Sequence, residues 1–124
     1  MKTILLVGCG GFLGAVSRYL VALAMLGLVG PGFPYGTWII NLTGSVLLGL
    51  TAGITLAKGS IPMELVLMIS IGFLGAYTTF STLTVETLHY VREGAYGLAA
   101  INSMGQMVCG LIAAGAGFYL GARV

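Results

Sequence analysis

Charge is what this sequence has least of. Only 6% of its 124 residues are Asp, Glu, Lys or Arg, whereas a soluble domain carries roughly a quarter. Three acidic and five basic side chains cannot cover a water-facing surface of this size. The mean hydropathy of +1.07 indicates the same. The low charge excludes a water-soluble domain and predicts an integral membrane protein.

Side chains that carry out catalysis are also scarce. The single histidine and the two cysteines stand in no metal-ligand spacing, and no Ser–His–Asp or Cys–His set can be assembled. A net charge of +2 without a basic run argues against nucleic-acid binding. We therefore expect no enzyme, and we expect Cys9 and Cys109 to be small packing residues.

Four apolar stretches remain once charged residues and Gly/Pro clusters divide the chain, at about 3–29, 35–57, 63–91 and 95–122. Each exceeds the roughly 20 residues that a helix needs to cross a membrane. A secretory signal at the start is disfavoured because Arg18 interrupts it. A β-barrel is disfavoured because apolar and polar residues do not alternate. We predict an all-α integral membrane protein in which 1–124 form a single four-helix transmembrane domain.

The ends of these stretches give only weak information on orientation. With four spans, Lys2, Lys58 and Arg123 share one side and Arg92 lies on the other, a modest positive-inside bias. This balance leaves room for insertion in both orientations. The aromatic residues near span ends fit the membrane-interface belt: Tyr35, Trp38 and Tyr96.

Polar side chains within the stretches must face protein or water, because a carboxamide in hydrocarbon is costly without partners. The amides that carry N–H donors are Asn41, Asn102 and Gln106, and hydroxyls follow in the third stretch. Neutral donors without carboxylates suit an anion better than a cation. Glu86 is the only acid well inside a span. It is either a functional group or a hydrogen-bonded structural carboxyl.

The third stretch contains a predicted break. Gly72 and Gly75 precede the pair Thr78-Thr79, and these residue types weaken a helix at mid-membrane depth. We expect the break near 76–79. Non-helical backbone at that depth is tolerated only when buried in protein or lining a cavity. Carbonyl groups exposed there would suit a cation such as sodium.

Three segments together resemble the CrcB, or Fluc, fluoride channel family. They are 10–19 (GGFLGAVSRY), 36–44 (GTWIINLTG) and 72–86 (GFLGAYTTFSTLTVE). The likeness covers the whole chain in length, span count and motif order. It implies a dual-topology antiparallel homodimer with two pores in a bacterial inner membrane. Such a dimer passively exports cytoplasmic fluoride and holds a structural sodium ion at its centre.

The resemblance also assigns residues. Asn41 and Phe80 match the fluoride-contacting positions, and Gly75 and Thr78 match those whose backbone carbonyls hold sodium. Arg18 and Glu86 match the basic residue of the first span and the acid of the third. The rest of the polar track falls on Ser81, Thr82, Leu83, Asn102 and Gln106.

Two positions depart from the family pattern. Leu83 stands where the family usually has a second pore phenylalanine, and Leu has no ring edge to offer an anion. Ala76 stands where Gly is frequent. The first departure predicts an altered ion position or rate, and the second a change in packing at the break.

Two other functions compete with the channel. A small dual-topology proton-coupled multidrug transporter would need an acid central to the first span, where this chain has Arg18. A non-transporting assembly subunit would use the polar stripes for packing alone. The first would move organic cations with protons, and the second would move no ion.

Overall fold

The computed structural model describes residues 1–59 and 61–124, and over these ranges it contains helices and no strand. In chain order the elements are α1 (Lys2–Val29), α2 (Tyr35–Lys58), α3 (Met63–Leu67), η1 (Met68–Leu74), α4 (Gly75–Tyr77), α5 (Phe80–Arg92), α6 (Tyr96–Ala100), η2 (Ile101–Gly105) and α7 (Gln106–Gly121). They form four segments long and apolar enough to cross a membrane: Lys2–Val29, Tyr35–Lys58, Met63–Arg92 and Tyr96–Gly121. The predicted four-span all-α fold is confirmed.

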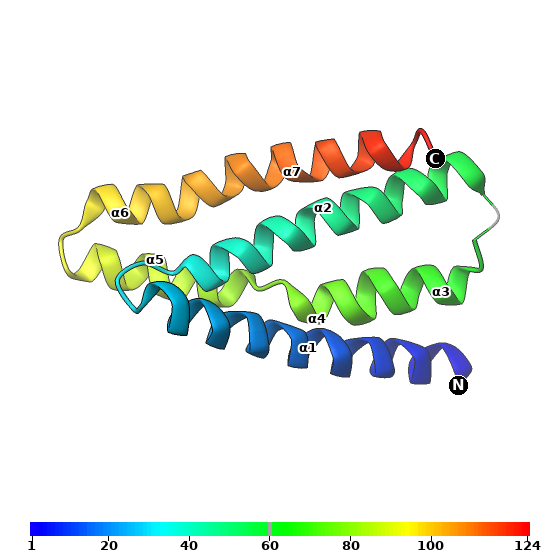
Figure 1. Ribbon diagram of the computed structural model, residues 1–124, viewed down its shortest axis with the longest axis horizontal. Helices are drawn as coiled ribbons and strands as arrows, with labels where there is room; N and C mark the ends of the chain where they lie inside the picture. The colour runs from blue at the N-terminus through cyan, green and yellow to red at the C-terminus, as the bar shows by residue number, and fades with distance from the viewer. Residues whose placement is uncertain (60) are drawn as a thin grey trace.

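The four segments run alternately up and down, and both termini lie at the same end of the molecule (Figure 1). Helix α1 packs along η1 and α4, and α2 packs along α7. Helices α5 and α6 meet at the opposite end from the termini. This arrangement follows from connections too short to return a chain across the membrane.

The third span is broken where the sequence predicts it. Helix α4 ends at Tyr77, and Thr78 and Thr79 are extended, with ψ angles of 160° and 116°. The Thr79 side chain then accepts a hydrogen bond from the Thr82 amide and caps α5. The extended pair tilts the two halves of the span apart at mid-length (Figure 1).

The third and fourth spans each contain a π-helical turn, η1 and η2, which the sequence does not predict. A π-helical turn closes i→i+5 hydrogen bonds and locally widens the helix. Apolar periodicity over a whole span does not reveal a local widening of this kind. In η2 the turn includes Asn102, whose side chain is fully buried.

Glycines bring the helix backbones together. A Cβ atom added to any of four glycines between α2 and α7 would fall against a backbone carbonyl oxygen of the other helix: Gly49, Gly53, Gly117 and Gly121. Gly10 and Gly14 of α1 lie equally close to the third span. Small residues are what lets helices in lipid approach this closely.

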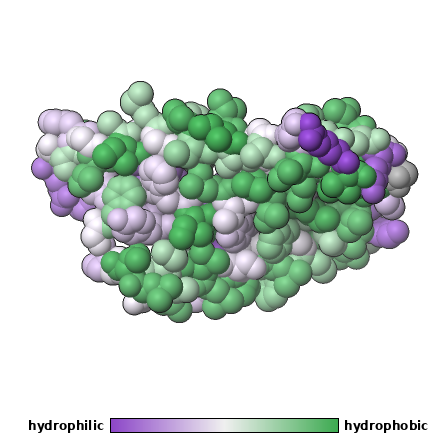
Figure 2. All heavy atoms as spheres, turned by 45° about the horizontal axis from the view of Figure 1, so that its top comes forward, coloured by the Kyte–Doolittle hydropathy of each residue, from purple (hydrophilic) through white to green (hydrophobic). Residues whose placement is uncertain are grey.

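Few side chains are buried within the single chain. The buried apolar residues among those described are Ile40, Leu74, Tyr77 and Ala99. Hydrophobic atoms cover most of the visible face, and hydrophilic ones gather mainly at the two ends (Figure 2). Lipid or further protein must therefore cover most of the outer surface.

Replacing Gly117 with Ala should destabilise the fold. The new methyl group would overlap the Val46 carbonyl oxygen, whereas the same change at Gly115 meets nothing within 4 Å. Overpacking of this kind costs about 1–3 kcal/mol. Thermal unfolding in detergent should show a lower midpoint for G117A and an unchanged midpoint for G115A. Equal midpoints would show that the glycine contact between α2 and α7 is not tight.

Candidate functional site

An open groove of about 520 Å³ lies between α2, α5 and the η2–α7 segment. Its polar lining includes Asn41, Thr79 and Gln106, which the spans bring together from three distant parts of the sequence. Phe80 and Leu83 form part of the α5 wall. The groove is otherwise mostly apolar, so its few polar atoms decide what it can bind.

The Asn41 side chain forms hydrogen bonds with the backbone at the break in the third span. Its Oδ1 atom accepts from the Thr79 backbone N–H at 2.9 Å, and its Nδ2 atom donates to the Thr79 carbonyl at 3.1 Å. The carboxamide thus pairs with both backbone groups of one extended residue, as a neighbouring strand would. The break needs such partners, because unpaired backbone groups in a membrane are costly.

A chain of amides continues from Asn41. Its Nδ2 atom also donates to Gln106 Oε1 at 2.9 Å, and Gln106 Nε2 donates to Asn102 Oδ1 at 2.9 Å. Asn102 Oδ1 accepts a second bond, from the Trp38 indole at 3.0 Å, and Asn102 Nδ2 donates to Thr87 Oγ1 at 3.1 Å. Asn102 and Gln106 are buried. All N–H groups of the Asn41 amide therefore have acceptors, so an ion that contacts one must displace that acceptor.

Trp38, predicted for the membrane interface, lies one turn into α2. Its indole is half-buried and donates to Asn102. The ring lies against Gly105, where an added Cβ would come within 2.9 Å of it. The signal that could have shown this is helical spacing, since Trp38 precedes Asn41 by one helical turn and so shares its face.

The α5 residues of the predicted pore divide between two faces. Phe80 and Leu83 line the groove, together with Thr84, which was not predicted as a pore residue. Ser81 and Thr82 are exposed and are not part of its lining; the Thr82 hydroxyl accepts from the Thr79 hydroxyl at 2.9 Å. Phe80 is 74% exposed, so its ring projects from the single chain.

The residues predicted to hold sodium lie on either side of the short helix α4, which begins at Gly75 and ends just before Thr78. Gly75 is exposed, and the Thr78 carbonyl lies 3.5 Å from Arg18 Nη1. Within the ranges that the structure describes, no cluster of His, Cys, Asp or Glu could hold a metal. A cation here would rely on backbone carbonyl oxygens, whose partial negative charge gathers at a helix C-terminus.

Glu86 lies beyond the groove and is bound to α2. The Thr37 hydroxyl donates to Glu86 Oε1 at 2.6 Å. The other carboxyl oxygen, Oε2, is buried and has no hydrogen-bond partner among the described residues. The carboxyl group therefore links α5 to α2 through one oxygen.

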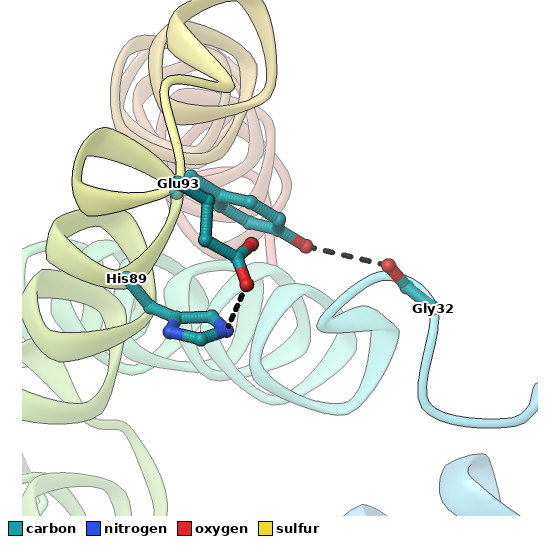
Figure 3. Close-up of polar contacts among 4 residues, drawn as sticks. Gly32, His89 and Glu93 are labelled. Atoms are coloured by element: carbon teal, nitrogen blue, oxygen red, sulfur yellow. Dashed lines mark hydrogen bonds and ion pairs between the residues drawn. The ribbon is translucent and has the colours of Figure 1, made fainter.

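His89 lies at the end of α5 and takes no part in the groove. Its Nε2 atom lies 3.3 Å from Glu93 Oε1, and its side chain is 69% exposed (Figure 3). Beside this pair, the Tyr90 hydroxyl donates to the Gly32 carbonyl at 3.5 Å in the loop between α1 and α2. The Tyr90 contact joins the end of α5 to the loop between α1 and α2, whereas the His89–Glu93 pair joins two residues at the end of α5 itself.

The family model described as "CrcB-like protein, Camphor Resistance (CrcB)" matches residues 5–118. The chain belongs to the CrcB family. A relative from Phenylobacterium zucineum (strain HLK1) is 41% identical over an alignment of 125 positions, which covers 100% of this chain and 98% of the relative. Relatives from Thermus thermophilus (40% over 121 residues, 98% and 96%) and Chlorobaculum tepidum (43% over 111 residues, 90% and 87%) are similar. Each of the three is named fluoride-specific ion channel FluC.

Replacing Thr37 with Val should destabilise the contact between α2 and α5. Val has the shape of Thr without its hydroxyl, so Glu86 Oε1 would lose the Thr37 hydrogen bond while Oε2 already has no partner among the described residues. Leaving a buried acceptor unpaired costs about 1–3 kcal/mol. Thermal unfolding should show T37V below the native protein and T37S, which keeps the hydroxyl, close to it. A T37V variant as stable as T37S would indicate that the Thr37–Glu86 hydrogen bond does not contribute to stability.

Proposed function

We propose that the chain is a fluoride-selective channel that exports cytoplasmic fluoride passively through a bacterial inner membrane. The observation that carries this proposal is the full-length similarity to relatives named as fluoride channels. The groove supports it, because its polar atoms are amides and hydroxyls in an otherwise apolar wall. Export needs no coupled reaction, since a potential negative inside drives an anion outward by about 2.3 kcal/mol per 100 mV.

Selectivity would come from replacing the water around a small, tightly hydrated ion. In the groove, Asn41 offers an N–H group, and the edge of the Phe80 ring carries partial positive charge. Thr84 and Thr87 add hydroxyls along the same wall. A larger halide would be excluded by width and would gain less from short contacts. Leu83 supplies bulk but no ring edge, so one side of the path relies on the remaining groups.

A second copy of the chain would complete the path. The groove is open on one side, and the Phe80 ring, 74% exposed, needs protein or lipid against it. Exposed hydroxyls on Ser81 and Thr82 favour protein over lipid. The weak charge bias of the loops is compatible with an antiparallel partner. We propose a dual-topology homodimer in which the α5 helices face each other.

Sodium would then be a structural ion at the centre of this dimer. The carbonyl oxygens of Gly75 and Thr78 would hold it, since hard oxygen donors at a helix end suit a small cation. The exposed position of Gly75 would let two copies approach one ion. When bound, sodium would neutralise the partial negative charge of carbonyls that the break leaves without helical donors.

Reconstituted vesicles test the function directly. Under an inward-negative potential, a fluoride electrode should record efflux of trapped fluoride, while trapped chloride stays inside. Replacing Phe80 with Ile should reduce efflux more than tenfold, because the ring edge is lost. Phe12→Ile, at a similarly exposed ring on α1, should leave the rate unchanged. Coupled movement of organic cations and protons without fluoride efflux would favour the multidrug transporter. The absence of any ion flux would favour an assembly subunit.

Removal of sodium should weaken the dimer. If carbonyls of Gly75 and Thr78 share one sodium ion, exchanging sodium for N-methylglucamine on both sides removes that link, and fluoride efflux should slow. Light scattering coupled to gel filtration should show more monomer in sodium-free detergent than in sodium. Unchanged efflux and mass in the absence of sodium would overturn the structural role of the ion.

A further inference from the structure

The hydrogen bonds that join Asn41, Gln106 and Asn102 beside the groove can run in one donor-to-acceptor direction only. The Trp38 indole N–H can donate but not accept, so the Asn102 atom that faces it must be oxygen. The same oxygen accepts from the nitrogen of Gln106. The Gln106 carbonyl oxygen is therefore turned towards Asn41, where it meets Nδ2 at 2.9 Å.

The other end of the chain fixes Asn41 independently. The Thr79 N–H must meet an acceptor and the Thr79 carbonyl must meet a donor, which sets Oδ1 and Nδ2 of Asn41. The two ends agree, so turning over any one amide would place like atoms against each other. Because Thr79 alone orients Asn41, Gln106 is not needed for that purpose.

Gln106 instead holds one particular hydrogen of Asn41. In the paired arrangement with Thr79, the Nδ2 hydrogen on the same side as Oδ1 points to the Thr79 carbonyl. The opposite hydrogen points to Gln106 Oε1. Asn41, Thr79 and Gln106 all line the groove. The Thr79 carbonyl is fixed by the backbone, whereas the Gln106 side chain can turn away, so this second hydrogen is the one that an ion in the groove can take over.

We propose that Gln106 is a standby acceptor, which holds the second N–H of Asn41, the one not paired with Thr79, until fluoride takes it. This inference rests on the proposed fluoride pathway. Without Gln106, that N–H would have no protein acceptor, and a fluoride ion pairing with it would displace nothing from the protein and so be bound more tightly. The Gln106 oxygen stabilises the empty groove and so weakens binding. Conduction needs binding weak enough for the ion to leave. Asn102 and Trp38 keep the oxygen turned towards Asn41.

Substitution at position 106 tests the proposal. Gln106→Met keeps the length of the side chain but offers no carbonyl oxygen. The fluoride concentration needed for the same rise in unfolding temperature should fall about fivefold, equivalent to about 1 kcal/mol. Maximal fluoride efflux should fall as well, because release slows. Gln106→Glu keeps an acceptor for Asn41, although it loses the donor to Asn102 Oδ1, and should show no tightening. Met104→Leu, at an exposed side chain of the same span outside the groove, should match the native protein.

A measurement on the native chain covers the case in which Gln106→Met does not fold. In ¹⁵N-labelled protein, added fluoride should shift the Asn41 side-chain proton opposite Oδ1 and leave the proton beside Oδ1 in place. Suppose that the native protein passes fluoride. If Gln106→Met then binds fluoride no more tightly than the native protein, or if both Asn41 side-chain protons stay in place when fluoride is added, the standby role alone is overturned. Native protein that passes no fluoride would overturn the proposed function itself.

Discussion

One side chain makes the broken third helix tolerable in a membrane. Asn41 accepts from the N–H of Thr79 and donates to its carbonyl, which gives a residue outside any helix the backbone partners that hydrocarbon cannot provide. The carboxamide costs little there because its own polar atoms are satisfied in the same contacts. The break and Asn41 therefore stabilise each other, and either would be unfavourable alone.

The fluoride pathway depends on this pairing in two ways. Pairing at Thr79 sets where α5 begins, and hence which of its residues face the groove: Phe80, Leu83 and Thr84. It also leaves a single Asn41 hydrogen for another partner, which is Gln106 in the structure. Gly105, beside Gln106, packs against the Trp38 ring of α2. The Asn41 amide thus both stabilises the break and supplies the N–H that would contact the ion.

Hydropathy alone was enough to predict the four spans, and the Gly and Thr residues of the third span were enough to predict its break at Thr78–Thr79. The division of the α5 hydroxyls was not predictable, because the extended pair resets the rotation of the helix that follows it. Ser81 and Thr82 therefore lie off the groove, while Thr84 lines it. The hydrogen bond from the half-buried Trp38 to Asn102 was not predicted, because the prediction rested on the position of Trp38 near a span end and not on its spacing from Asn41. These details depend on rotation and local helix widening, which composition does not encode.

The pairing of Asn41 with Thr79 can be measured in the membrane itself. Solid-state NMR on protein labelled with ¹⁵N at Asn side chains and ¹³C at Thr carbonyls reports the distance between the Asn41 nitrogen and the Thr79 carbonyl carbon. A hydrogen bond between them places these atoms about 4 Å apart. A strong dipolar coupling at that distance is the predicted result. A separation beyond about 6 Å, too long for any hydrogen bond between these groups, would contradict the account.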